Sequence, residues 1–248
     1  MPDAPPVSAI TFPDSDIAVK LKLAVRGIIA AFTKNERQDL VSDDVLLAWY
    51  DNIHIPDVVA TSGIPTALRF EAVGPDAAPL PWLVVYPTDD INFTKSDEFN
   101  RMQPGGHPEI KGHMYPDLAK IDLRICERKY IHNAPGEKPG THTLHSQLPQ
   151  TLSHLRKDKI CCGIEYVEKL DKAPGFRRAT SYNLVSSLTE GASRRLALHE
   201  FETANIPWAG LAEARADPRS KELLSKAAVV DEYDYQLVTE AGDKTQAL

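Results

Sequence analysis

The segments SGIPTALRF (62–70) and PGFRRATSY (174–182) carry the clearest information about the fold, because they align with each other inside the chain. A shift of 112 positions places Phe70 on Tyr182 and keeps a glycine at the second position of both segments. An aromatic residue at the same place in two strand-like segments is typical of a duplicated structural unit. The chain is therefore expected to contain two related halves.

Two further pairs of segments keep the same order at nearly the same offset. They are WYDNIH (49–54) with CCGIEY (161–166), and LVVY (83–86) with LALH (196–199). Self-similarity at a fixed spacing indicates repeated supersecondary units. The repeat therefore extends over most of the chain.

Each half shows the element pattern β-α-β-β-α-β. Apolar or alternating runs predict strands at 21–32, 66–73, 81–88 and 121–131, and again at 141–147, 176–185, 194–202 and 229–238. Helical segments are expected between the first and second and between the third and fourth strand of each half. This is the split-βαβ, ferredoxin-like plan.

The first helix has clear start and stop signals. Ser42 is a suitable N-cap, and Asp43 and Asp44 follow it in the first turn, where the helix dipole favours negative charge. The residue before a proline avoids the α region, so the helix is expected to end before Pro56. His54 would then lie at the C-terminal end of the helix.

The predicted fold class is α+β, with two tandem ferredoxin-like units. Such a unit buries one sheet face under helices and leaves the other apolar face bare, so it needs a partner sheet. Two units in one chain can pair their antiparallel sheets into an α+β barrel. The expected organisation is a loose N-terminal arm (1–18), a first unit (19–132), a proline- and glycine-rich linker (133–140) and a second, diverged unit (141–248).

Composition excludes several classes of protein. The 248 residues include 28 Lys and Arg against 35 Asp and Glu, a net charge of −7, which argues against a nucleic-acid partner. No apolar run is long enough to span a membrane, and the acidic, proline-rich start does not resemble a signal peptide. The three cysteines, Cys126, Cys161 and Cys162, do not form a disulfide framework. We therefore expect a cytoplasmic protein with reduced thiols.

The segment WYDNIHIPD (49–57) resembles the WY-x-x-E-H-I-P segment of EthD-like proteins, which belong to the dimeric α+β barrel superfamily. A glycine at Gly63, an Arg-aromatic pair at Arg69 and a W-L-x-x-Y strand starting at Trp82 agree with it. The likeness covers roughly residues 20–240 and corresponds to a tandem two-unit form. The sequence departs from the pattern at Ile53, where glutamate is usual, and in the second unit, which has tyrosine in place of the histidine. One functional pocket is therefore expected, in the first half.

The resemblance implies the turnover of small aromatic or polyketide compounds. Known reactions of such proteins are cyclisation, dehydration, decarboxylation, isomerisation and cofactor-free oxygenation. Because one fold supports many functions, the reaction has to be argued from the site.

His54 is the leading candidate for an acid–base group. At a helix C-terminus its protonated form would be favoured, and Asp51 or Asp57 could orient the ring. The alternative is that His54 only caps the helix end. Tyr86 is the third catalytic candidate, as a hydrogen-bond donor to a substrate oxygen or enolate, with packing as its alternative role.

Five further residues are candidates for substrate binding: Trp49, Tyr50, Arg69, Tyr166 and His199. Arginines on strands could hold a carboxylate or phenolate, although ion pairs at strand ends explain them equally. Six histidines between positions 107 and 154 have no metal-ligand spacing, so neither a metal nor another cofactor is expected.

The function that these observations favour is a cofactor-free, small-molecule enzyme, an acid–base lyase or cyclase acting on an aromatic or polyketide-like substrate. Two alternatives remain open: a non-catalytic binding or stress-related barrel protein, and a cofactor-free oxygenase. The expected partner is a small-molecule substrate, with neither nucleic acid nor membrane, and a homodimer stays open.

Overall fold

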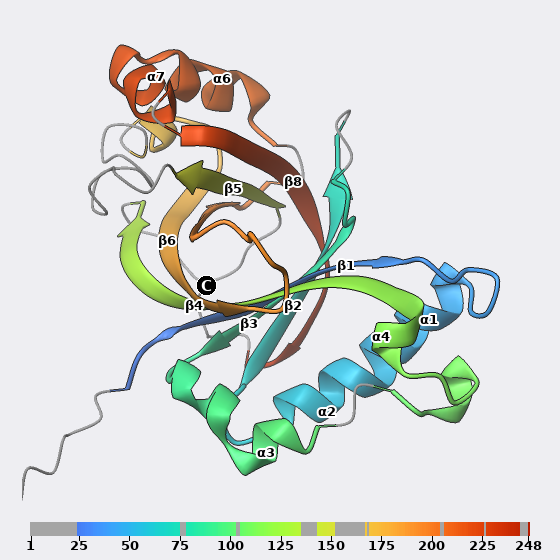
Figure 1. The fold of residues 1–248 in the computed structure, drawn as a ribbon. Helices are drawn as coiled ribbons and strands as arrows, with labels where there is room; N and C mark the ends of the chain where they lie inside the picture. Colours follow the sequence, from blue (N-terminus) through green and yellow to red (C-terminus); the bar gives the residue numbers. More distant parts are fainter. Residues whose placement is uncertain are drawn as a thin grey trace, which may run out of the picture.

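The structure, a computed structural model, describes residues 24–74, 78–102, 105–134, 143–151, 167, 169–203, 206–225, 227–243 and 248. Several predictions lie outside these residues: the arm at 1–18, most of the linker at 133–140, both vicinal cysteines and Tyr166. The described residues form an α+β structure around a closed barrel of antiparallel strands (Figure 1).

Eight strands form the barrel, four from each half of the chain. Those of the first half are β1 (Gly27–Asn35), β2 (Thr66–Val73), β3 (Trp82–Thr88) and β4 (Ala119–Asn133). Those of the second half are β5 (Thr143–Thr151), β6 (Phe176–Ser187), β7 (Arg195–Phe201) and β8 (Ala227–Gly242). The order around the barrel is β1-β3-β2-β8-β5-β7-β6-β4, so the first half has the order β4-β1-β3-β2 and the second β8-β5-β7-β6.

The helices pack on the outside of the barrel (Figure 1). The first half carries one long helical segment, made of α1 (Asp43–Trp49), the π-helical η1 (Tyr50–His54) and α2 (Ile55–Val59). Short helices follow: η2 (Ile91–Lys95), α3 (Asp97–Asn100), η3 (Pro108–Ile110) and α4 (Tyr115–Leu118). The second half carries α6 (Trp208–Ala216) and α7 (Pro218–Ser225).

Strand alternation divides the apolar side chains between two layers. In β3, Leu83 and Val85 belong to the core inside the barrel, whereas Val84 and Tyr86 pack outside it under the helices of the first half. Successive residues of β3 thus alternate between the two layers. Because successive side chains of a strand point to opposite faces, both faces of this strand are buried.

The strand ends follow the hydrogen-bonded pairing of the barrel. The second strand has the predicted bounds, 66–73, and the third begins one residue later than predicted. The first strand was predicted at 21–32, but β1 runs from Gly27 to Asn35. Its pairing with β4 continues to Asn35, opposite Ala119, so the partner strand carries the ladder into a polar segment that hydropathy alone assigns to a loop.

The prediction that the first helix ends before Pro56 is wrong. The chain stays helical to Val59, and the amide of Ile55 donates to the carbonyl oxygen of Tyr50, five residues earlier. This wide π turn interrupts the α-helical hydrogen-bond ladder just before the proline. Pro56 therefore lies in the first turn of α2, where a backbone N–H has no helical carbonyl partner, so proline, which has no N–H, fits there. His54 therefore lies inside a continuous helical segment.

Substitution of Phe70 tests how much the packing of the barrel interior contributes to the free energy of unfolding. Its side chain is fully buried among the inner faces of the strands. Phe70→Ala should lower the free energy of unfolding by about 3–5 kcal/mol, because it removes a large buried ring and leaves a cavity. Denaturant unfolding measures this. Phe70→Leu, which retains most of the volume, should cost much less, and equal losses for both variants would contradict the argument.

Candidate active site

A cavity of about 280 Å³ lies between the outer face of the first-half strands and the helices that cover them. Its walls are mainly apolar, as is usual for small-molecule sites. The polar side chains in its lining are Thr33, Tyr50, His54, Tyr86 and Tyr115. They come from β1, η1, β3 and α4, so the long helical segment and the sheet together build the site.

The π turn places His54 among aromatic rings. A π turn brings residues five apart onto one face of the helix, and the His54 ring stacks on Trp49 with centroids 5.3 Å apart and planes 23° apart. The ring of Tyr50 lies 4.8 Å from the His54 ring. His54 thus enters the cavity from a well-packed aromatic support.

Burial makes His54 a neutral base. Desolvation in this apolar environment lowers the pKa of His54 to about 4, although the negative charge of Asp57 acts in the opposite direction. The expectation that a helix C-terminus raises its proton affinity is wrong, because the helix continues past His54. At neutral pH the ring is uncharged and can accept a proton.

Three tyrosine hydroxyls gather in the same cavity. The hydroxyls of Tyr50 and Tyr86 are 3.3 Å apart and hydrogen-bonded, and the Tyr115 ring lies 5.2 Å from that of Tyr50. Burial raises the pKa of all three phenols above the ordinary value. They therefore remain protonated, as hydrogen-bond donors in an apolar environment.

Asp51 does not orient His54. Its carboxylate accepts two hydrogen bonds from the guanidinium of Arg69, at 2.5 Å from Nε and 2.7 Å from Nη2. Arg69 is 4% exposed, and neither residue lines the cavity. This bidentate pair ties the π turn to β2. The structure therefore places Asp51 and Arg69 behind the site.

The remaining predicted site residues do not line the cavity or lie outside the described residues. Trp49 is buried and supports His54 from behind, outside the lining of the cavity. His199 is fully buried on β7, in the second half of the barrel, and does not line this cavity. The position of Tyr166 lies outside the described residues. Of the eight predicted residues, the structure brings His54, Tyr50 and Tyr86 together in the cavity.

Sequence reasoning missed several lining residues. Tyr115 lies in the segment 103–117, which reads as a loop, yet it begins the short helix α4 and its ring reaches Tyr50. The Tyr-Pro pair there is a helix-start signal, since proline is favoured in a first turn. Thr33, Phe99, Met102 and Leu188 also line the cavity, and no local signal marks them.

Among the described residues, no group of three His, Cys, Asp or Glu side chains is arranged to hold a metal ion. Within the same part of the chain, no helix is long and apolar enough to cross a membrane.

The solved structures that resemble this chain include the following two proteins. An "anthrone oxidase-like protein" superposes with a TM-score of 0.58 at 12% identity, over 87% of this chain and 92% of that one. A "putative monooxygenase from Lactobacillus acidophilus NCFM" superposes with a TM-score of 0.53 at 11% identity, over 90% of this chain and 99% of that one. No protein-family model and no curated protein matches the sequence. These similarities concern the fold alone.

The charge state of His54 can be measured directly. We expect its ring to titrate near pH 4 in the folded protein, followed by NMR of the imidazole signals. Because its pKa is lower than the ordinary 6.5, the unfolded chain binds the proton first as the pH falls. The resulting contribution to stability is complete above pH 6.5 and is lost towards pH 4. His54→Gln should weaken this dependence, and a midpoint near 6.5 would contradict the burial argument.

The Asp51–Arg69 pair should matter for stability. Asp51→Ala leaves the guanidinium of Arg69 buried without its counter-charge, so the free energy of unfolding should fall by about 1.5–3 kcal/mol, the range for hydrogen bonds to charged groups. Adding Arg69→Met should cost less than the sum of both changes. The exposed pair of Arg37 and Asp39 is a matched control, and Asp39→Ala should leave stability almost unchanged. Equal effects of Asp51→Ala and Asp39→Ala would refute the assignment.

Proposed function

We propose that this protein is a small-molecule enzyme that removes a proton from an aromatic or polyketide-like substrate. The observation that carries the proposal is the neutral imidazole of His54 in an apolar cavity with three protonated tyrosine hydroxyls. A positioned base and donors for the negative charge that develops are the two requirements of such a reaction. The chemistry needs no group beyond these side chains and the substrates, and we propose that it proceeds without a cofactor.

Each group has a distinct role in the proposed reaction. His54 accepts the proton from a carbon or hydroxyl of the substrate. The hydrogen-bonded pair of Tyr50 and Tyr86, together with Tyr115, donates to the oxygen on which the negative charge accumulates. Because the walls of the cavity are mainly apolar, these hydrogen bonds to a developing enolate or phenolate are stronger than they would be in bulk solvent.

Oxygenation is the first reaction that we propose to test. The structural similarity to an anthrone oxidase-like protein supports it as an analogy of fold. A methylene next to an aromatic ketone loses a proton to His54, and the carbanion reacts with O₂ to give a hydroperoxide after protonation. Loss of water then leaves a carbonyl, so CH₂ and O₂ become C=O and H₂O. The substrate is oxidised and O₂ is reduced.

A lyase or cyclase reaction is the second candidate. The same proton abstraction, without O₂, leads to elimination or ring closure, and a neutral base with phenol donors serves both outcomes. O₂ consumption separates the two: an oxygenase consumes one O₂ per turnover and stops under anaerobic conditions, whereas a lyase or cyclase does neither. A binding protein would retain the ligand without turnover.

We also infer that the two halves are tandem ferredoxin-like units, with boundaries at 19–132 and 141–248, in the manner of EthD-like proteins. The equivalent strand orders β4-β1-β3-β2 and β8-β5-β7-β6 support this inference. So do the buried aromatics Phe70 and Tyr182, which occupy equivalent strands and the same barrel core.

Substitution of His54 tests the proposed base. His54→Ala should lower turnover of a hydroxyanthrone, followed by absorbance and O₂ uptake, by about 10²- to 10⁴-fold, which is the usual contribution of a general base. The variant should stay folded, because His54 lies at the cavity wall outside the barrel core, although it loses the stacking contact with Trp49. Activity should survive a chelator.

His54→Gln is the control for shape, because it retains a hydrogen-bonding group without comparable basicity. It should be as inactive as His54→Ala. Full activity of both variants would refute the role as a base, and unfolding of both would show that the ring is structural.

A further inference from the structure

Leu188 combines two properties that rarely occur together. It lines the cavity of the first half, yet its side chain is 74% exposed. It belongs to the second half of the chain, immediately after β6 and at the start of the turn that leads to β7. The other described lining residues come from the first half.

The backbone around Leu188 is held in place. The amide of Leu188 donates to the carbonyl oxygen of Leu123 on β4 at 3.1 Å. The next amide, that of Thr189, donates to the hydroxyl of Ser187 at 2.9 Å. Leu188 is therefore fixed between two anchored neighbours, so its exposure is not explained by a loose turn.

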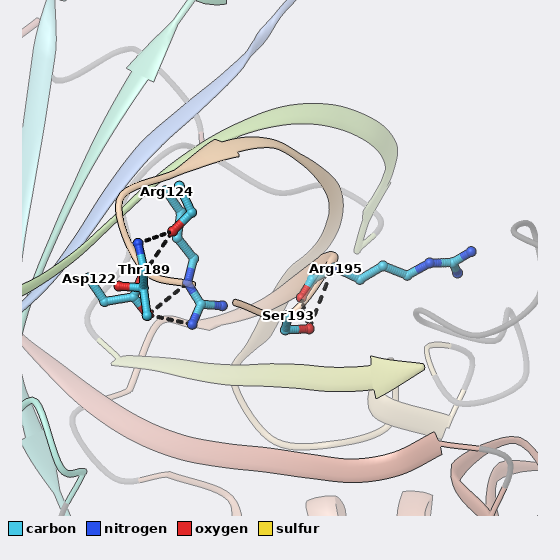
Figure 2. A network of polar contacts seen from close by, with 6 residues as sticks. Asp122, Arg124, Thr189, Ser193 and Arg195 are labelled. Atoms are coloured by element: carbon cyan, nitrogen blue, oxygen red, sulfur yellow. Dashed lines mark hydrogen bonds and ion pairs between the residues drawn. The ribbon is translucent and has the colours of Figure 1, made fainter. Parts of the chain in front are cut away.

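A buried ion pair on β4 supports this anchor (Figure 2). The guanidinium of Arg124 donates to Asp122 at 2.5 and 3.0 Å, and the hydroxyl of Ser187 donates to the other carboxylate oxygen at 3.4 Å. On the far side of the turn, the hydroxyl of Ser193 donates to the carbonyl oxygen of Arg195 at 2.9 Å. Both ends of the turn are thus bonded, and the position of Leu188 is set by the junction of β4 with β6.

The wall beside Leu188 is apolar and open. Ile121 and Leu123 lie on the outer face of β4, line the cavity and are only partly buried. An exposed leucine next to two partly buried aliphatic side chains leaves apolar area in water that a bound apolar molecule would cover. The rest of the cavity is closed by helices and aromatic residues.

We propose that Leu188 is a substrate-contacting residue, supplied by the second half, that covers the outer edge of a planar, multi-ring aromatic substrate bound against β4. The inference rests on the proposed function for the class of substrate. It adds that the site is assembled from both halves and that the ring system extends from His54 to the cavity mouth.

Binding, measured apart from turnover, tests this proposal. The probe is dihydroxyanthraquinone, a planar aromatic ketone without a methylene to deprotonate. It is titrated while the tryptophan fluorescence of the protein is recorded, to which Trp49, stacked on His54, contributes. Leu188→Ala should raise the Kd by about three- to tenfold, because it removes most of the apolar area that the ring covers. Leu188→Met should restore most of the affinity, and neither variant should lower the thermal midpoint, since the side chain is exposed.

Val185 is the matched control. It lies on β6, three residues before Leu188, is 51% exposed and does not line the cavity, so Val185→Ala should leave the Kd within twofold of the wild type. Equal Kd values for Leu188→Ala and the wild type overturn the proposal, as does a wild type that does not bind the probe. Failure of the proposed function gives a different result. In that case the probe binds and Leu188→Ala raises its Kd, but His54→Ala leaves turnover unchanged.

Discussion

Closure of the barrel is the constraint on which the rest of the structure depends. Each four-stranded sheet has an apolar inner face that must be covered, and the two seams, β2 with β8 and β4 with β6, join the sheets so that both faces are buried together. Large side chains such as Phe70 and Tyr182 fill the interior. The helices are thereby left to cover the outer faces, and the cavity forms where they incompletely cover the first sheet.

The seam between β4 and β6 also connects structure to function. It pairs Arg124 with Ser187, and this pairing sets the next residue, Leu188, at the mouth of a cavity otherwise lined by the first half. The second half therefore contributes side chains to the barrel interior and also supplies Leu188 to the lining of the cavity.

The π turn between α1 and α2 explains most of the departures from expectation at the site. It accommodates Pro56 within a continuous helical segment and stacks His54 on Trp49. Hydropathy patterns assume a regular period, so a single wide turn is invisible to them. The same turn directs Asp51 to Arg69 on β2. Asp51 was expected to orient His54 because the two are three residues apart in the sequence, and this spacing could not reveal that its true partner lies eighteen residues away.

By itself, the sequence determined the strand segments, their alternation and the aromatic-histidine segment at 49–54, because these depend on local apolar periodicity and residue type. Only the tertiary structure decided the pKa of His54, since the cavity wall that buries its ring combines the neighbouring Tyr50 with residues that are distant in sequence. It also decided that Tyr115 and Leu188 belong to the site. Tyr115 arrives through a short helix in a loop-like segment, and Leu188 through strand pairing between halves, and neither long-range contact leaves a periodic signal in the chain.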